Sequence, residues 1–494
     1  MTTPLDPAQL TDATATQLAS ALAGGATTSV DVVTALLDRI ASIDAPGTAI
    51  ELRSVLAVAP DALDAARRAD AERASGTVRS ALHGVPIMVK DNIEAVGLPG
   101  SAGATSLAGR AVVADAPLVA RLREAGVVVI AATNLSQWAN MRSPLSTSGW
   151  SAVGGLTVNP FRLDRSAGGS SSGSGAALAA RLTPLAVGTE TDGSITCPAS
   201  VNGVVGIKPA VGTVPGQGIV PIARSQDSAG PMGRTVADVA LLYEILTAVP
   251  GVAERVAAGA AGLRVGVATS LVSSNPPTTA HFKAALRALE RAGASLHDVA
   301  VASTTEETGN DEVAVMLAEL YDDLGSYLSG RPGGGPRSLE EAIAHENANA
   351  AVELAHFGHE YFDQAVATGG RAGPAYGPAR ERNLAWALGQ CLEPALAGVD
   401  VYVAPCFGPS WRSDLTLGQK YSDFSGVTHA PAIAGWPIAS VPMGVVDDLP
   451  VGFAIVSRPG GEATMLAIAG ALEAGLGLAR SDALVPRYLA PGRA

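Results

Sequence analysis

The sequence predicts an α/β protein in which helices flank a β-sheet. From about residue 82 onward, short apolar runs rich in β-branched residues alternate with segments whose apolar residues lie three or four positions apart. Such alternation is typical of strands that are connected by helices. We expect strands at residues 85–89, 127–130, 185–187, 204–207, 399–403 and 438–441, and helices at residues 117–125, 176–181, 235–248 and 462–475.

The first 75 residues carry the signals of helices. Asp6-Pro7 and the run Thr27-Thr28-Ser29 precede segments with helical apolar spacing. Side chains of these types accept hydrogen bonds from the first turn of a helix. We therefore expect residues 1–75 to form a helical segment packed on the core, and residues 76–490 to form one α/β domain.

Two regions of this domain differ in character. Residues 82–240 hold the motifs described below, whereas residues 300–390 form a variable, mostly helical region interrupted by Gly-rich stretches at 331–336 and 369–377. The variable region is predicted to be an insertion or a lid-forming segment. The chain has no internal repeat and no long polar linker, so a single domain is expected.

Composition excludes several classes of protein. The chain has 494 residues, 47% of them hydrophobic, and a net charge of −13. This composition excludes a disordered chain and gives no overall basic field for nucleic acid. No apolar run is long enough to cross a membrane, no secretory signal is visible, and the three cysteines lack metal-ligand or redox spacing. We expect a cytoplasmic protein without a metal or cofactor.

The most informative stretch is SAGGSSSGSGA at residues 166–176. Every residue from 168 to 175 is Gly or Ser, and the run leads into an expected helix. It predicts tight turns with exposed N–H groups and hydroxyls. A flexible linker is the alternative, which the flanking apolar segments disfavour.

A second turn and a lysine complete the candidate chemistry. The turn GTETDGSI spans residues 188–195 after an expected strand, and Lys90 ends the apolar run at 84–89. Desolvation at a strand end favours a neutral lysine, which can act as a base. A lysine that extends to solvent or forms a salt bridge is the alternative, and from this feature alone it is favoured.

Together these segments resemble the amidase signature family. The resemblance covers roughly residues 25–480 and rests on LHGVPIMVKDNI at 82–93, TNLSQWAN at 133–140, GGSSSGSGAALAA at 168–180, GTETDGSITCP at 188–198 and GVVGIKP at 203–209. It implies a large mixed, twisted sheet covered by helices on both faces. It also implies a metal-free, cofactor-free amide hydrolase with a Ser–cis-Ser–Lys triad. In that triad Ser194 is the nucleophile, Ser170 is the bridging serine in a cis peptide with Gly169, and Lys90 is the base.

The chemistry of this triad follows from general principles. A serine hydroxyl needs an adjacent base, and neutral Lys90 could accept the Ser194 proton through the hydroxyl of Ser170. Backbone N–H groups of the turn at Thr191, Asp192 and Gly193 are expected to form the oxyanion hole. Activity should rise with pH as Lys90 loses its proton.

The finer resemblance is to the peptide amidase branch of the family. It rests on TETDGSI with the following CP, on WSAVGG at 150–155 and on SQDSAGPM at 225–232. This branch implies removal of C-terminal amides from peptides with release of ammonia. By the same analogy Asn140, Met141 and Trp150 line the acyl pocket, and the 300–390 region shapes the substrate entrance. Asp192 either orients a network at the nucleophile turn or caps that turn.

Other interpretations remain open. The family also contains an amidotransferase-type subunit that works with partner subunits, and amidases that transfer acyl groups. A Ser-His-Asp α/β-hydrolase is a remote alternative, because Ser171 sits in a G-x-S-x-G pattern and His429 could serve as its histidine. His356 and His359 could bind a metal, although surface histidines are the better interpretation. We expect a monomer or homodimer that binds a peptide or small-molecule amide, and neither nucleic acid nor membrane.

Overall fold

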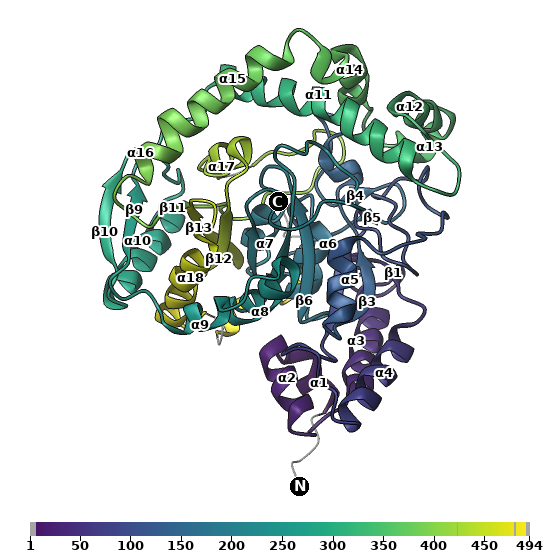
Figure 1. The fold of residues 1–494 in the computed structure, drawn as a ribbon, viewed down its shortest axis with the longest axis vertical. Helices are drawn as coiled ribbons and strands as arrows, with labels where there is room; N and C mark the ends of the chain where they lie inside the picture. The colour runs from purple at the N-terminus through teal and green to yellow at the C-terminus, as the bar shows by residue number, and fades with distance from the viewer. Residues whose placement is uncertain (1–5, 422, 479–480, 491–494) are drawn as a thin grey trace.

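The computed structural model describes residues 6–421, 423–478 and 481–490. Its centre is a mixed sheet of 11 strands, so the α/β prediction is confirmed (Figure 1). The strands, in their order across the sheet, are β1 (Val55–Val58), β3 (Val128–Thr133), β2 (Pro86–Lys90), β6 (Leu185–Glu190), β8 (Ser228–Gly233), β7 (Val205–Lys208), β12 (Ile438–Val446), β13 (Leu449–Ser457), β11 (Val401–Pro405), β9 (Arg264–Ala268) and β10 (Ser295–Val299). A separate two-stranded ribbon joins β4 (Trp150–Ser151) to β5 (Gly155–Leu156).

Helices surround this sheet. They are α1 (Pro7–Asp12), α2 (Ala15–Ala23), α3 (Ser29–Ile43), α4 (Ala62–Ala74), α5 (Pro117–Glu124), α6 (Ser172–Ala179), α7 (Thr196–Val201), α8 (Val236–Thr247), α9 (Val252–Ala257), α10 (Pro276–Arg291), α11 (Glu306–Gly330), α12 (Leu339–Ala348), α13 (Ala350–Glu353), α14 (Glu360–Thr368), α15 (Tyr376–Trp386), α16 (Glu393–Ala395), α17 (His429–Ala434) and α18 (Glu462–Leu476). Single turns occur at η1 (Gln137–Asn140), η2 (Gly370–Ala372) and η5 (Asp482–Leu484), and α15 continues into a π-helical turn, η3 (Ala387–Leu392).

The N-terminal segment is mostly helical, as its capping signals predict. Asp6 and Thr28 accept hydrogen bonds from the first turns of α1 and α3. The segment also supplies the edge strand β1, which pairs antiparallel with β3 and which the sequence did not predict. Figure 1 shows α1–α4 gathered at one end of the molecule, where the chain begins.

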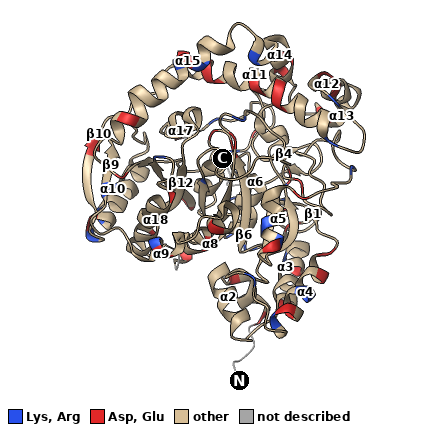
Figure 2. Ribbon diagram, viewed as in Figure 1, with Lys and Arg blue, Asp and Glu red and all other residues tan. Residues whose placement is uncertain are grey.

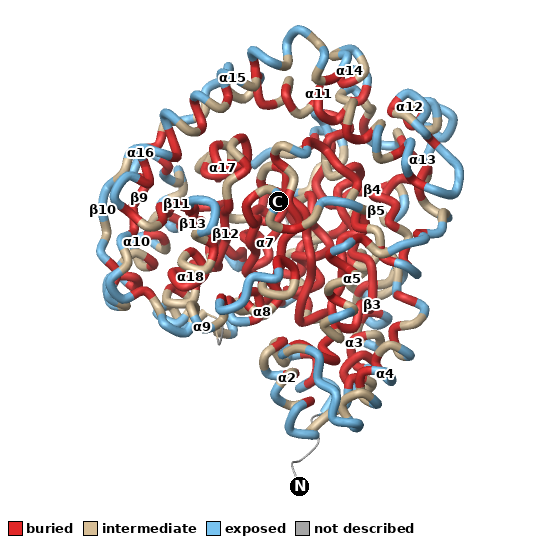
Figure 3. Tube along the Cα trace, viewed as in Figure 1, coloured by how far each residue is buried: buried red, intermediate tan, exposed pale blue. Residues whose placement is uncertain are grey.

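Side chains from both faces of the sheet are buried under helices. Along β13, Phe453 and Ile455 pack in the cluster that contains Leu466 of α18, whereas Ala454 and Val456 pack in the cluster that contains Ile433 of α17. Successive residues of a strand point to opposite faces, so this alternation places helices on both sides of the sheet. Figure 3 shows the central strands buried and the outer helices exposed along one side.

The variable region forms an arch at the opposite end from α1–α4. Helix α11 packs against α14 and α15, and α15 packs against α17 (Figure 1). The whole of this region from 306 to 395 is helical apart from short connections. Helix α11 of the arch and helix α17, which packs on the arch, therefore lie near the part of the sheet that carries the candidate site.

Charged residues are sparse in the centre of the molecule. Figure 2 shows them mostly on the outer helices, and strands β3, β11, β12 and β13 contain none. Three central strands instead end on a charged residue: β2 on Lys90, β6 on Glu190 and β7 on Lys208. Among the described residues, no helix is long and apolar enough to cross a membrane.

Candidate active site

The three charged strand ends meet at one edge of the sheet. Strands β2 and β6 are parallel, and both β6 and β7 pair antiparallel with β8, so β2, β6 and β7 run in the same direction. Lys90, Glu190 and Lys208 therefore lie at the same edge, and Asp227, just before β8, joins them there. Carboxyl ends of neighbouring strands are a common place for a ligand site in α/β proteins.

The Gly/Ser stretch lies against this edge as a tight loop that is buried except at Gly169, which is partly exposed. The peptide bond between Gly169 and Ser170 is cis. The Ser170 carbonyl accepts a hydrogen bond from Ser136 N–H at 3.1 Å. Helix α6 starts at Ser172, earlier than expected, and a Cβ at Gly173 would lie 2.5 Å from the carbonyl oxygen of Asn134. Glycine is needed there because the loop packs directly on the backbone of another segment.

Lys90 and Ser170 are brought into direct contact. The Lys90 Nζ lies 2.7 Å from the Ser170 Oγ, and both side chains are buried. Lys90 also donates to the side-chain and carbonyl oxygens of Thr189, at 2.8 Å and 3.2 Å. The Thr189 hydroxyl in turn accepts from Asn92 Nδ2 at 3.0 Å. The lysine of the sequence motif is therefore held in a buried network and is not extended to solvent.

Burial changes the pKa of Lys90. Desolvation lowers its pKa from the usual 10.5 to about 7, although the negative charges of Asp227 and Glu190 oppose this shift. A large part of the molecules therefore carries a neutral amine near neutral pH. A base works best when its pKa is close to the operating pH.

Ser194 lies in the turn between β6 and α7, and Glu190 organises this turn. The carboxylate of Glu190 accepts the N–H groups of Ile195 at 2.7 Å and Thr196 at 2.8 Å. The N–H of Ser171 donates to the Ser194 carbonyl at 3.0 Å, which joins this turn to the Gly/Ser loop. Burial raises the pKa of Glu190, while Lys208 and the two N–H groups lower it.

The turn also has N–H groups without a backbone partner among the described residues. Within the described chain, the N–H groups of Asp192, Gly193 and Ser194 make no hydrogen bond to another backbone group. The carbonyl of Thr191 accepts from buried Lys208 at 2.8 Å, which holds the start of the turn. Lys208 therefore has a structural contact at this turn.

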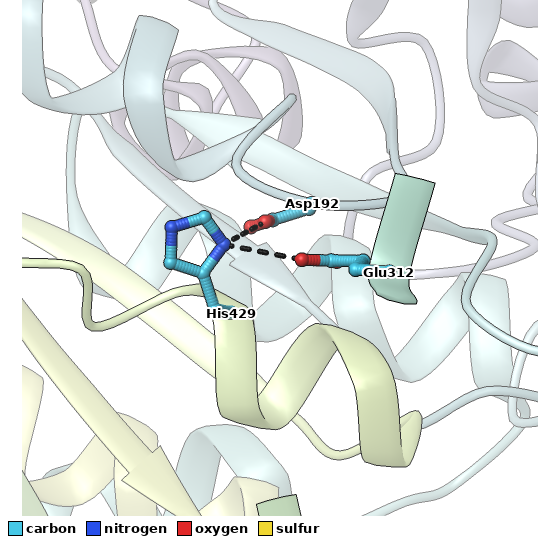
Figure 4. A group of neighbouring side chains, drawn as sticks. All are labelled: Asp192, Glu312 and His429. Atoms are coloured by element: carbon cyan, nitrogen blue, oxygen red, sulfur yellow. Dashed lines mark ion pairs between the residues drawn. The ribbon is translucent and has the colours of Figure 1, made fainter. Parts of the chain in front are cut away.

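Asp192 takes part in a charged cluster at the rim of this turn. The Nδ1 atom of His429 lies 2.7 Å from Oδ2 of Asp192 and 3.3 Å from Oε2 of Glu312 (Figure 4). One ligand atom from each of the three residues lies within 4.8 Å of the others, a spacing that a metal ion could use. Sequence reasoning proposed a network for Asp192 but missed Glu312, which has no motif around it.

A cavity of about 190 Å³ lies beside the site. Its lining includes Asn92, Thr189, Thr191 and Asp227, together with apolar side chains of the 211–222 segment. The Thr191 hydroxyl donates to Asp227 at 2.5 Å. Burial raises the pKa of Asp227 to about 6, although hydrogen bonds from the Thr191 hydroxyl and from the N–H groups of Ile222 and Ala223 oppose the shift. The cavity therefore touches both the lysine network and the nucleophile turn.

The expected acyl-pocket residues do not line this cavity. Trp150 is buried edge-to-face against His356 and Phe357. Met141 is also buried, and Asn140 has a left-handed backbone (φ 77°) with a buried Oδ1 that accepts no hydrogen bond among the described residues. Their role in an acyl pocket stays a prediction.

The rival sites of the sequence analysis are not assembled. The Ser171 hydroxyl is buried and donates to the Thr189 carbonyl at 3.1 Å, and no histidine of the described chain contacts it. His359 pairs with Glu346 at 3.0 Å and does not share a cluster with His356. The structure therefore gives no support to a Ser-His-Asp hydrolase centred on Ser171.

Known proteins provide an independent comparison. The profile of the family described as Amidase matches residues 31–466, which is most of the chain. The chain belongs to the amidase family. This amidase is accordingly an amidase-signature hydrolase, an enzyme that acts on carbon–nitrogen amide bonds.

Relatives of this amidase include two groups of high coverage. In the first group, one subunit of the glutamyl-tRNA(Gln) amidotransferase of Salinispora arenicola is 33% identical, with 95% of this chain and 98% of that protein covered. In the second, the native peptide amidase of Stenotrophomonas maltophilia is 38% identical, with a TM-score of 0.86 and with 94% of this chain and 97% of that chain covered. A peptide amidase in complex with the competitive inhibitor chymostatin is 39% identical, with a TM-score of 0.87 and coverage of 93% and 97%.

Proposed function

We propose that the protein hydrolyses C-terminal amides of peptides, or similar small carboxamides, through an acyl-enzyme on Ser194. The observation that carries this proposal is the 2.7 Å contact between Lys90 Nζ and Ser170 Oγ. Burial lowers the pKa of Lys90, and Ser171, which follows Ser170, donates its N–H to the Ser194 carbonyl. The contact therefore links the lysine to the turn that carries Ser194. The higher identity to peptide amidases than to the amidotransferase protein supports the substrate class.

In the proposed first step, the Ser194 hydroxyl attacks the amide carbonyl carbon. Its proton passes to the Ser170 oxygen while the Ser170 proton passes to neutral Lys90, so Ser170 ends the step unchanged. The carbonyl oxygen becomes an oxyanion that the N–H groups of the turn at Asp192 and Gly193 would bind. One such donor is worth on the order of 10²–10³ in rate.

In the second step, the tetrahedral intermediate collapses. The proton on Lys90 returns through Ser170 to the amide nitrogen, the carbon–nitrogen bond breaks and ammonia leaves. Water then adds to the acyl ester on Ser194 and gives up a proton along the same path to Lys90. The bond between the acyl carbon and the Ser194 oxygen breaks, the proton returns through Ser170 to that oxygen, and the free carboxylic acid is released. Each residue finishes the cycle in its starting state.

The test is an ammonia-release assay over peptide amides, aryl amides and simple aliphatic amides. We expect turnover of amidated dipeptides by the wild-type protein alone, with loss of activity in Ser194→Ala and Lys90→Ala. Full activity of Lys90→Ala would contradict the proposed base. Turnover that required a partner protein would favour the amidotransferase-type alternative, which the 33% identity to the Salinispora arenicola protein supports. An added amine nucleophile, with product analysis, separates hydrolysis from acyl transfer.

A further inference from the structure

The cluster of Asp192, Glu312 and His429 connects the nucleophile turn to the helical arch. Asp192 lies two residues before Ser194, Glu312 projects from α11, and His429 begins α17 (Figure 4). Both carboxylates face the same imidazole nitrogen, at 2.7 Å and 3.3 Å. These contacts join three segments that are far apart in the sequence.

The side chain of Glu312 is held in place by burial and by a hydrogen bond. Only 4% of its side chain is exposed, and its Oε1 accepts a hydrogen bond from Gln226 Nε2 at 3.0 Å. Asp192 has less support, because its Oδ1 is buried without a hydrogen-bond partner among the described residues. The imidazole of His429 therefore ties the less supported carboxylate to the better supported one.

The charges explain why the imidazole is protonated. Burial would lower the pKa of His429, but the charges of Asp192 and Glu312 raise it well above its usual value of 6.5. The same imidazolium lowers the pKa of Asp192, whereas burial and Asp192 raise the pKa of Glu312. A neutral imidazole would leave the two carboxylates facing each other without the cation between them.

We propose that His429 is a positioning residue for the hydrolysis proposed above. As an imidazolium it fixes Asp192 against Glu312 and so holds the backbone N–H groups of the turn where the oxyanion forms. The inference rests on the proposed function, and it adds a residue to which the sequence motifs assign no role. It acts through the turn and does not itself touch the reacting atoms.

Other groups lie around α17, but His429 is the side chain placed between Asp192 and Glu312. Thr428 forms a side-chain hydrogen bond to Asp192 and therefore supports the same carboxylate. From α15, Arg380 donates to the carbonyl of Ile433 at 2.7 Å, at the other end of α17. The ring of Phe424 packs edge-on to the imidazole with a centroid separation of 5.5 Å. On the sheet side, the charge of Lys208 acts on both Asp192 and Glu312.

The decisive comparison is between His429→Gln and wild type, with His281→Gln as a matched control. His281 is a partly buried histidine on α10 that contacts the Val445 carbonyl at 3.0 Å, away from the cluster. We expect His429→Gln to lower kcat by at least roughly tenfold with little change in KM, because positioning of oxyanion donors matters most in the transition state. His281→Gln should behave as wild type.

One readout separates positioning from a general loss of structure. A peptide aldehyde forms a tetrahedral adduct with the serine, so its inhibition constant should weaken by about the same factor as kcat/KM falls. Unchanged aldehyde affinity would overturn the proposal.

Glu312→Gln keeps the test informative if His429→Gln fails to fold. The amide retains the shape of Glu312 and an acceptor for Gln226, so it should lower kcat in the same direction by a smaller factor. The effects of the two substitutions should be less than additive when combined. Wild-type kcat in a folded Glu312→Gln would overturn the proposal.

A metal ion bound by Asp192, Glu312 and His429 is the alternative, and a zinc titration tests it. Zinc titrated into the wild type should not increase kcat, and a chelator should not decrease it, because the imidazolium already satisfies the two carboxylates. Activation by zinc that is lost in His429→Gln would show that the cluster binds a metal, and it would overturn the proposal.

Failure of the proposed substrate can be recognised separately. If the wild type releases no ammonia from peptide amides, the substrate class is wrong. The rate of inactivation of Ser194 by a fluorophosphonate still reports the oxyanion turn, since the serine displaces fluoride from phosphorus while the phosphoryl oxygen occupies the place of the oxyanion. A slower rate in His429→Gln than in His281→Gln supports the inference, and equal rates would overturn it.

Discussion

Lys90 donates two hydrogen bonds to Thr189, one to its hydroxyl at 2.8 Å and one to its carbonyl at 3.2 Å. A neutral amine has two N–H donors and one lone pair. If Thr189 takes both donors, the lone pair is left for the third neighbour, the Ser170 hydroxyl at 2.7 Å. Thr189 therefore orients the Lys90 amine toward Ser170, as the proposed mechanism requires.

The first prediction concerns the pH dependence of the wild-type enzyme. Because burial lowers the pKa of Lys90 to about 7, kcat/KM should fall about tenfold per pH unit below that value and level off above it. The protonated lysine cannot accept the serine proton, which sets the sign of this dependence. Initial rates on an amidated dipeptide across the acid range give the profile. A plateau that extends down to about pH 5 would contradict Lys90 as the base.

The second prediction uses Asp227 to move this profile. The negative charge of Asp227 raises the pKa of Lys90 against the larger effect of burial. Asp227→Asn removes that charge and keeps an acceptor for Thr191, so the pKa of Lys90 should fall further and the acid limb should shift to lower pH. Asp298→Asn, on the exposed edge strand β10, is the control and should leave the limb in place. A shift to higher pH in Asp227→Asn would be the opposite of this expectation.

The sequence predicted the centre of the fold because burial and strand formation coincide there. The apolar runs that became β2, β6 and β7 are buried throughout, and apolar β-branched runs signal such strands. Strand β8 was missed because Ser228–Gly233 contains no β-branched residue. Its hydrogen bonds to β6 and β7 make it a strand, and a Cβ at Gly230 would overlap the carbonyl oxygen of Ile207.

The candidate site divides in a similar way. Lys90, Ser170 and Ser194 lie in motifs whose composition is unusual enough to single them out. Glu312 and His429 lie in an ordinary amphipathic helix and an irregular loop end, far from Asp192 in the sequence. Only the packing of α11, α15 and α17 on one another brings them to the nucleophile turn. This tertiary contact leaves no local pattern in the sequence.

The third prediction concerns stability through Arg142. This buried guanidinium lies 3.5 Å from Glu353 and 3.7 Å from Glu346, and it stacks on the ring of Phe357 at 4.6 Å. Arg142→Ala leaves the buried carboxylate of Glu353 without its cation and leaves Glu346 with His359 alone, so the free energy of unfolding should fall by about 3–5 kcal/mol. Denaturant unfolding measures this change. Arg67→Ala removes an exposed pair with Asp64 and should have little effect, and equal losses in both variants would contradict the argument.

The last prediction tests how the Gly/Ser loop is held. A Cβ at Gly173 would overlap the carbonyl oxygen of Ser54 and would lie 2.6 Å from the backbone nitrogen of Asn134. Because neither neighbour is a flexible side chain, Gly173→Ala must displace α6 and with it Ser170. We expect kcat/KM to fall by roughly 10²-fold, since a shift of about 1 Å at a catalytic group has that effect.

The matched control for Gly173→Ala is Gly325→Ala. Gly325 lies inside α11 with open space around its Cβ position, so alanine there should stabilise the protein by about 0.5–1 kcal/mol and leave kcat/KM unchanged. Thermal unfolding measured beside turnover separates the two effects. If Gly173→Ala kept both the stability and the turnover of the wild type, the added methyl group would not have displaced Ser170, and the prediction would be wrong. The close packing of Gly173 on the 54 and 134 backbones would then have no part in placing Ser170 beside Lys90.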